Sequence, residues 1–257
     1  MFSLLGNSRD GHEWRFRILE VPVRVQAWFW LTVGLSAAAR QTGDALIWIG
    51  VCFVSIVVHE LGHVAAFWLF GVRAEAILYG WGGLAVPEKG WSLNARSQSI
   101  VSLAGPAAGF CLAALIAVVA KFAGAKFVLG VTLYVIPSVN AFLVSFPPIG
   151  NVLLNDLLCV NVYWALVNLL PVYPLDGGQV VRAMLEEADP VRGHRRTLLV
   201  SALAGAAIAS MALLAENTYL VFLFGCLTVA SVTELAAPKP GFPPSAYSSW
   251  RGGNRLE

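Results

Sequence analysis

Long apolar runs separated by short polar stretches dominate the pattern of this chain. The runs lie at about 25–39, 45–70, 98–120, 152–175, 197–215 and 218–236. Each is close to the ~20 residues that an α-helix needs to cross the hydrocarbon core of a bilayer, although the first is short. The pattern therefore predicts an all-α polytopic membrane protein with about six transmembrane helices.

Two stretches depart from the helical pattern. Residues 74–96 combine short apolar stretches with glycines, which predicts short strands near residues 75–87. Non-helical backbone is tolerated at membrane depth only where protein or water surrounds it. This β-like segment is therefore either a re-entrant strand pair beside a wet site or a loop at the membrane surface. Residues 15–24 alternate roughly between charged and apolar positions, which is compatible with another short strand at the surface.

Residues 127–147 are also apolar enough to cross the membrane, but charge bias argues against a seventh span. Lys and Arg gather in cytoplasmic loops. With six spans and a cytoplasmic N-terminus, the outer loops hold only three of the 17 basic residues, namely Arg40, Lys121 and Lys126. A span at 127–147 would move the basic loop 192–196 to the outside. We therefore expect an external or interfacial hairpin there.

The same pattern divides the chain into three parts. Residues 1–24 form an N-terminal cytoplasmic lead-in, and residues 25–236 form the transmembrane domain, with its core at 45–187. Residues 237–257 are rich in Pro, Gly and Ser, which predicts a flexible C-terminal tail. We expect the first apolar run to act as an uncleaved insertion signal.

Composition supports the membrane interpretation and excludes several classes of protein. Of the 257 residues, 58% are hydrophobic and 12% are charged, and the mean hydropathy is +0.70. A soluble domain carries about 25% charged residues, so the chain is expected to sit in a lipid bilayer. The net charge of +2 gives no support for nucleic-acid binding. The four cysteines lie in apolar stretches and suggest packing by small thiols, with no disulfide framework.

A His-Glu-x-x-His sequence lies inside the second apolar run, as His59-Glu60-Leu-Gly-His63. Two histidines four residues apart share one face of a helix, so their imidazoles can converge on one metal ion. Glu60 can then act as general base on a water at the open coordination position. One ionisable residue at the centre of a span costs roughly 2.5–3.5 kcal/mol. Three in one run need compensation, either from a metal ion in a wet pocket or from a buried polar cluster that pairs helices.

A catalytic zinc ion needs a third protein ligand. His12 and His194 lie in charged stretches and are interpreted as surface residues. Asp176 is a better candidate, because it follows the fourth apolar run where two prolines and two glycines break the helix. The second and fourth runs have the same direction in a six-span topology, so Asp176 and His63 can meet at one depth. From spacing alone, Asp176 is either the third ligand or the cap of the next short helix.

Three motifs together resemble the site-2 protease family of intramembrane zinc metalloproteases. They are His59-Glu60-Leu-Gly-His63, the segment Ser102-Leu-Ala-Gly105-Pro106-Ala-Ala-Gly109, and Asn168 to Pro171 followed by Pro174-Leu-Asp176-Gly. They occur in the family's order on successive runs, over roughly residues 45–187. The chain shows neither a PDZ-like insertion nor a CBS domain, so the resemblance is to a short prokaryotic type.

The resemblance implies one zinc ion per chain, held by His59, His63 and Asp176, with Glu60 as the catalytic base. It also implies that Asn168 lies in the active site, where it steadies the substrate carbonyl or the oxyanion. The implied activity is hydrolysis of peptide bonds within or near membrane-spanning segments of other proteins. Family members commonly release a membrane-tethered transcription regulator or process an anti-sigma factor. The compactness of the chain and the lack of eukaryotic trafficking signals favour a prokaryotic inner membrane, and the charge bias of the loops places the active site toward the cytoplasm.

Three alternatives remain open on the sequence. A membrane metal transporter or sensor would share the metal ligands but would not need Glu60. A catalytically silent homologue could bind a membrane client, although the intact His-Glu-x-x-His sequence argues against that. A different class of membrane zinc protease takes a glutamate as its third ligand, and Glu234 is the nearest candidate.

Overall fold

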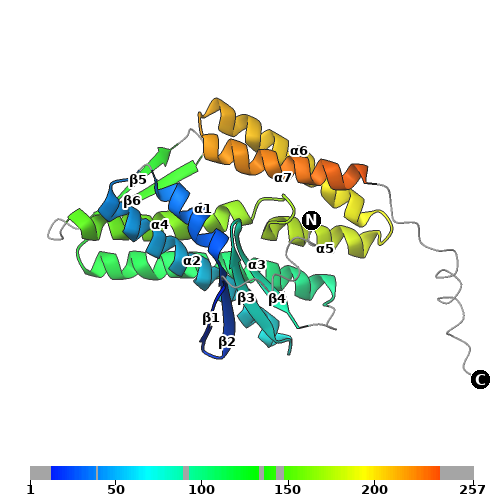
Figure 1. Ribbon diagram of the computed structural model, residues 1–257, viewed down its shortest axis with the longest axis horizontal. Coiled ribbons are helices and arrows are strands. Elements are labelled where there is room, and N and C mark those ends of the chain that lie inside the picture. Colours follow the sequence, from blue (N-terminus) through cyan, green and yellow to red (C-terminus); the bar gives the residue numbers. More distant parts are fainter. Residues whose placement is uncertain (1–12, 39, 89–92, 133–135, 143–147, 238–257) are drawn as a thin grey trace, which may run out of the picture.

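Five long helices form the body of the protein. The structure, a computed structural model, describes residues 13–38, 40–88, 93–132, 136–142 and 148–237 (Figure 1). In these residues, five helices are long and apolar enough to cross a membrane: α2 (Thr42–Leu69), α3 (Ala95–Phe122), α4 (Pro148–Asn168), α6 (Gly193–Leu214) and α7 (Thr218–Ala236). They correspond to the second to sixth apolar runs, as expected for a multi-pass integral membrane protein. Residues 1–12 of the predicted lead-in and 238–257 of the predicted tail lie outside the described residues.

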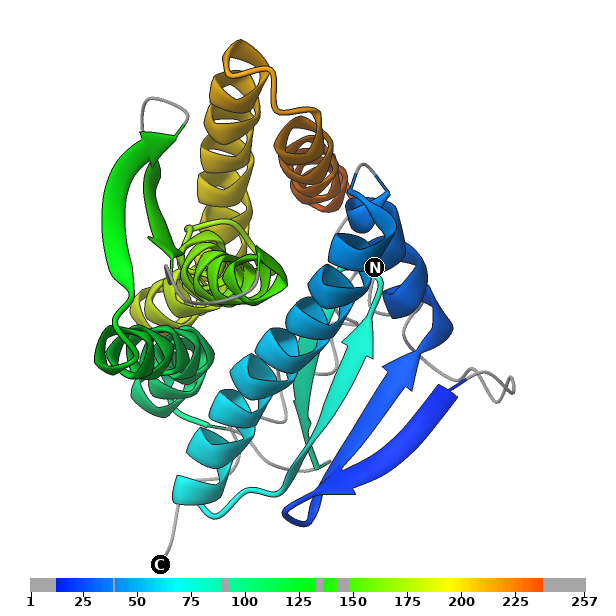
Figure 2. The same ribbon diagram turned by 90° about the vertical axis from the view of Figure 1, so that its left-hand side faces the viewer.

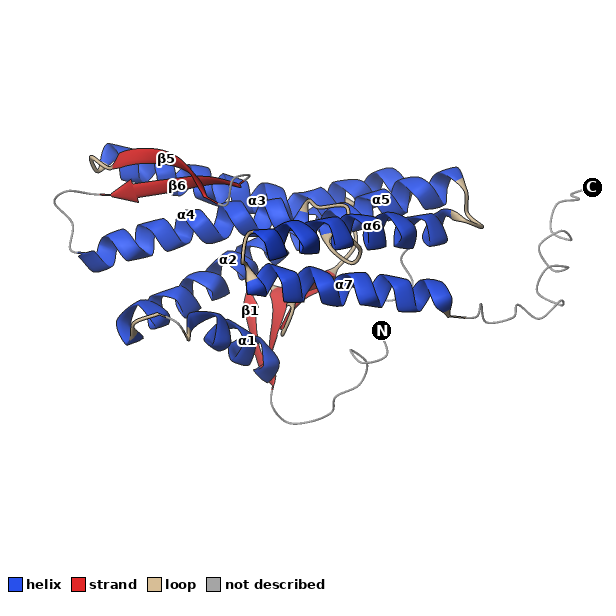
Figure 3. Cartoon of the chain, turned by 90° about the horizontal axis from the view of Figure 1, so that it is seen from above, coloured by secondary structure: helices blue, strands red, loops and turns tan. Residues whose placement is uncertain are grey.

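The helices pack in two groups. Helix α3 packs against α2, α4 and the shorter helix α5 (Asp176–Ala188). Helices α6 and α7 form a hairpin beside them, joined to the rest through α5 (Figure 2). Seen from above, α3, α4, α6 and α7 run along one common direction (Figure 3). Helices α2 and α3 carry the first two motifs singled out in the sequence, and the third runs from the end of α4 at Asn168 to the start of α5 at Asp176.

A four-stranded sheet lies against α2, which corrects the expectation of an all-α fold with one strand pair. Its strands are β1 (Glu13–Ile18), β2 (Val21–Gln26), β3 (Ala74–Tyr79) and β4 (Gly82–Pro87), in the order β1-β2-β3-β4. The β3–β4 pair is the predicted β-like segment, and β1 and β2 extend it. Alternate residues of β2 and β3 are buried and join the core formed with α2. The other alternate positions of these two strands include Arg24 and Glu75, which form an ion pair at 3.2 Å.

The first apolar run is not a full-length helix, because strand β2 takes its first part. Helix α1 (Ala27–Ala37) has 11 residues, which is about 16 Å and too short for a ~30 Å hydrocarbon core. However, β2 leads directly into α1 and pairs parallel with β3, which begins just after α2 ends. Strand β2 and helix α1 therefore lie beside α2 and run in the opposite direction (Figure 2). Together they are about 36 Å long. A prediction based on helix length alone misses this composite segment.

The hairpin predicted at 127–147 is present as an antiparallel pair. Strand β5 (Lys126–Thr132) pairs with β6 (Ile136–Phe142), from Lys126 opposite Phe142 to Thr132 opposite Ile136. It lies between the end of α3 and the start of α4, away from α5 (Figure 1). The hairpin is confirmed, while its position relative to the membrane stays a prediction.

Candidate metal centre

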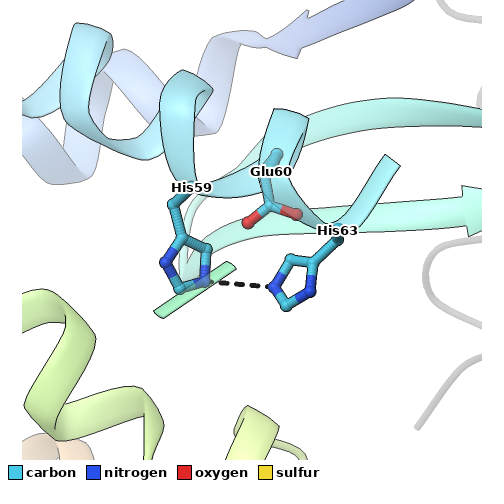
Figure 4. A group of neighbouring side chains, drawn as sticks. All are labelled: His59, Glu60 and His63. Carbon is cyan, nitrogen blue, oxygen red and sulfur yellow. Dashed lines mark hydrogen bonds between the residues drawn. The ribbon is translucent and has the colours of Figure 1, made fainter. Parts of the chain in front are cut away.

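Two histidines and a glutamate point inward from the middle of α2 (Figure 4). His59, Glu60 and His63 are 2%, 2% and 6% exposed, although all three are polar. The distance between the two Nε2 atoms is 3.2 Å, as expected for imidazoles one helical turn apart on one face. The donor atoms of the three residues lie within 4.8 Å of one another. The apolar run thus brings three ionisable groups to one point inside the bundle.

Asp176 joins this cluster from a segment more than a hundred residues further along the chain. Its Oδ2 lies 3.1 Å from His59 Nε2 and its Oδ1 lies 3.3 Å from His63 Nε2. Asp176 is the first residue of α5, but the N-cap is Leu175 and no side chain caps this helix end. The capping interpretation of Asp176 is therefore wrong. The break after α4 turns the carboxylate of Asp176 toward both histidines.

The donor spacing fits a tetrahedral zinc ion. Two donors that each lie 2.0–2.1 Å from zinc at tetrahedral angles are about 3.3 Å apart. The two Nε2 atoms are 3.2 Å apart, Asp176 Oδ2 is 3.1 Å from His59 Nε2, and Asp176 Oδ1 is 3.3 Å from His63 Nε2. Two imidazoles and one carboxylate are also a common ligand set of catalytic zinc, which leaves a fourth position open. The residues present therefore fit a zinc ion bound by both histidines and the Asp176 carboxylate.

Glu60 lies beside these donors but contacts the sheet. A Cβ atom at Gly83 of β4 would collide with the Glu60 carboxylate, so only glycine lets this strand pass there. The Oε2 atom of Glu60 is buried without a hydrogen-bond partner among the described residues. A buried carboxylate oxygen with no protein partner is suited to accept a proton from a water or a substrate group.

Helix α3 holds His63 from the other side. The His63 Nδ1 lies 2.7 Å from the carbonyl oxygen of Val101, which fixes the tautomer that leaves Nε2 free to bind a metal ion. A Cβ atom at Gly105 would overlap His63 Nε2. At Gly62 of α2, a Cβ atom would lie 2.6 Å from the Ala104 carbonyl oxygen. The Ser102–Gly109 segment thus serves close packing against the metal-site helix.

No hydrogen bond connects the remaining candidates to this cluster among the described residues. Asn168 ends α4 and is 8% exposed, and its amide nitrogen donates to the Trp164 carbonyl oxygen over 2.9 Å. No hydrogen bond joins Asn168 to His59, His63 or Asp176 in the described structure. Glu234 contacts His194 at 2.9 Å on the exposed ends of α7 and α6, so it is not a third ligand. His12 lies outside the described residues.

Sequence reasoning missed the residues that support the cluster. Gly83, which contacts Glu60, was not singled out, and Gly105 was quoted only as part of a motif, without its contact with His63. The role of both glycines depends on strand and helix packing that spacing does not show. Asn161 was also missed, although a polar residue in the middle of the fourth apolar run was a visible signal. Its amide contacts Ser55, one turn before His59 on α2.

Comparison with known proteins agrees with this arrangement. The profile of Peptidase family M50 matches residues 47–212. The chain is 28% identical over 204 residues to "Zinc metalloprotease MJ0392" of Methanocaldococcus jannaschii, covering 77% of this chain and 52% of that protein. It is 32% identical over 135 residues to "Putative zinc metalloprotease sll0528" of Synechocystis sp., covering 52% of this chain and 30% of that protein. The chain thus spans about half or less of the length of these curated relatives.

A solved structure shows the same fold. The "Site-2 Protease from Methanocaldococcus jannaschii" superposes with a TM-score of 0.55 at 22% sequence identity. The match covers 90% of this chain and 99% of that chain. The sheet and the helices therefore belong to a fold that has been seen before.

Proposed function

Because this chain belongs to peptidase family M50, we propose that it is an intramembrane zinc metalloprotease. It hydrolyses peptide bonds within or near transmembrane segments of other membrane proteins. One observation carries the proposal: the Nε2 atoms of His59 and His63 lie 3.2 Å apart, and each has an oxygen of Asp176 at 3.1 or 3.3 Å, beside a buried glutamate. A purely structural polar cluster would not require the tetrahedral spacing, and a transporter or sensor would not require Glu60.

Each residue of the cluster has a defined task in this proposal. His59 Nε2, His63 Nε2 and one Asp176 oxygen hold a single zinc ion, and the Val101 carbonyl oxygen keeps His63 in the binding tautomer. When bound, zinc polarises the scissile carbonyl and lowers the pKa of a coordinated water toward about 7. The free Oε2 of Glu60 accepts the proton of the attacking water and later passes it to the leaving amine. The burial of Glu60 excludes competing solvent around that carboxylate.

Asn168 is proposed to steady the substrate carbonyl or the oxyanion. It ends α4, immediately before the break that delivers Asp176. Its amide nitrogen donates one hydrogen to the Trp164 carbonyl oxygen, which leaves a second N–H for another acceptor. A neutral amide donor is the kind of group that stabilises a developing oxyanion.

The topology favours an active site toward the cytoplasm of a prokaryotic inner membrane. Helices α2 and α4 run in the same direction, so their ends near the cluster lie on one side with α5 and the start of α6. That side also carries Arg192, Arg195 and Arg196, and clusters of this kind mark the cytoplasmic face. A membrane-tethered regulator or an anti-sigma factor is the substrate type that this orientation suits.

We propose that the substrate adds as a strand to β4. β4 is the edge of the sheet, and Gly83 in this strand touches Glu60. A helical substrate hides its carbonyls in hydrogen bonds and must unwind before attack, and an edge strand offers main-chain partners for the unwound segment. Strand addition at β4 would place the extended peptide beside the catalytic base.

Proline substitutions in β4 test this docking mode. Successive backbone N–H groups alternate between β3 and the free edge, so one of Leu84→Pro and Ala85→Pro removes only an outward donor. We expect that variant to raise KM about 5–20-fold, in line with the loss of one hydrogen bond to the substrate, with unchanged zinc content. Cleavage kinetics identify the variant with the raised KM, and thermal unfolding shows whether that variant is folded. Unchanged KM in a folded variant at both positions would exclude strand addition at this edge.

Metal removal tests the proposed activity itself. We expect the purified protein in detergent to contain about one zinc ion per chain and to cleave at least one member of a panel of tagged single-span proteins. A chelator should abolish cleavage, and added zinc should restore it. A protein that contains no zinc would contradict the proposal. Zinc without cleavage, together with zinc flux across proteoliposomes, would support a transporter instead.

A further inference from the structure

The two metal-site histidines differ in how their second ring nitrogen is held. His63 Nδ1 has the Val101 carbonyl oxygen at 2.7 Å. His59 Nδ1 is buried without a hydrogen-bond partner among the described residues. Metal-binding histidines almost always donate this second N–H to a carboxylate, a carbonyl oxygen or a water molecule. One ligand of the proposed zinc ion is therefore incompletely held by the described protein atoms alone.

Helix α4 presents an unused acceptor next to His59. The Asn161 side chain is 2% exposed, and its Nδ2 donates to the Leu157 carbonyl oxygen at 2.8 Å and to Ser55 Oγ at 2.9 Å. A carbonyl oxygen can only accept, so this contact fixes which amide atom is the nitrogen. The remaining atom, Asn161 Oδ1, is buried and has no hydrogen-bond partner among the described residues.

Helices α2 and α4 pack together around the residues that carry these two atoms. Ser55 precedes His59 by one turn on the same face of α2, and helical side chains lean toward the preceding turn. Trp164, three residues after Asn161 on α4, lies edge-on to the His59 ring with centroids 6.5 Å apart. The Trp164 indole nitrogen is also buried without a partner in the described part of the chain. A donor, an acceptor and a second donor, all buried and without a partner in the described part of the chain, thus come from residues on the facing helices α2 and α4.

We infer that one buried water molecule bridges His59 Nδ1 and Asn161 Oδ1, and that Asn161 is a positioning residue for the zinc ligand His59. A water molecule that makes two hydrogen bonds of about 2.8 Å at a roughly tetrahedral angle joins atoms about 4.6 Å apart, and it would give both unpartnered atoms a partner. The water accepts from His59 Nδ1–H and donates to Asn161 Oδ1, and the Trp164 indole can supply a further hydrogen. Buried waters typically make about three such bonds.

The inference rests on the proposed zinc site, and it assigns a role to a residue that contacts neither metal nor substrate. Asn161 acts by fixing the tautomer and the ring angle of His59. Loss of this kind of outer support typically weakens metal binding about 10–100-fold.

Zinc affinity of Asn161→Leu tests the inference against a matched control. Leucine removes the acceptor and fills the space of the water. The control is Asn155→Leu on the same helix, because Asn155 also donates to the carbonyl oxygen four residues earlier, at 2.8 Å. We expect chelator competition to show zinc binding weakened about 10–100-fold by Asn161→Leu and altered no more than about threefold by Asn155→Leu. The visible spectrum of the cobalt-substituted protein should change only in Asn161→Leu.

A rescue variant of Asn161 and a smaller substitution at Ser55 complete the test. Asn161→Asp retains an acceptor oxygen and should restore zinc affinity and the cobalt spectrum. If Asn161→Leu does not fold, Ser55→Ala is compared with Ser231→Ala, another buried serine in a spanning helix, and only the former should weaken zinc binding. Equal zinc affinity and spectra in Asn161→Leu and its control would overturn the inference. Failure of the wild type to bind zinc would instead overturn the proposed function.

Discussion

Glu60→Gln should abolish proteolysis while the protein keeps its zinc. Glutamine has the size of glutamate but cannot accept the proton of the attacking water. General-base catalysis contributes about 10²–10⁴-fold, so we expect kcat to fall by that factor. The three metal donors are His59, His63 and Asp176, so zinc content should remain at the wild-type level. Cleavage of a single-span substrate and zinc analysis of the same preparation measure both quantities.

Stability provides the control for this variant. Glu60 is 2% exposed and its Oε2 lacks a partner among the described residues. Replacing a buried carboxylate with a neutral amide removes an unfavourable burial of charge, so the thermal midpoint should not fall. Glu187→Gln makes the same chemical change at an exposed site on α5 and should leave kcat unchanged. Full activity of Glu60→Gln would eliminate the base assignment, and loss of zinc would mean that Glu60 is itself a ligand.

The local part of this site was predictable from sequence, because it depends on helix geometry alone. Histidines four residues apart converge on any α-helix, so His59 and His63 required no tertiary information. Asp176 could be proposed because the Pro and Gly residues that break the helix are visible in the sequence. Whether Asp176 binds the metal or caps α5 was not predictable, since the answer depends on how α5 is packed relative to α2 and α3.

The non-local parts of the fold were less predictable. Apolar composition does not show how far a helix extends, so the run at 25–39 predicts a span, whereas α1 covers only Ala27–Ala37 and follows directly on β2. The parallel pairing of β2 with β3 joins residues about fifty positions apart, Val23 with Ala76 for example. Likewise, the contact between Asn161 and Ser55 joins positions 106 residues apart. The periodicity of apolar residues along the sequence does not indicate such long-range pairings.

The glycines of α3 give the second large effect that we expect. Gly105→Ala should remove zinc from the site, although the change adds only one methyl group. That methyl group would overlap His63 Nε2, and Val101 holds the same ring through its Nδ1. The imidazole must therefore leave its position between α2 and α3. Outer-shell losses already weaken metal binding about 10–100-fold, so displacement of a ligand should weaken it by more than about 100-fold. Zinc titration and cleavage assays should both show the loss.

A second glycine separates this effect from any change in helix stability. At Gly225 on α7, a Cβ atom would meet nothing within 4 Å, so Gly225→Ala should keep full zinc content and activity. Alanine favours a helix over glycine by about 1 kcal/mol, so both substitutions stabilise their helices locally. A folded Gly105→Ala protein that lacks zinc would therefore trace the defect to His63. Normal zinc affinity in that variant would mean that α3 can move away from α2, and that the close packing of these helices does not position the metal ligand.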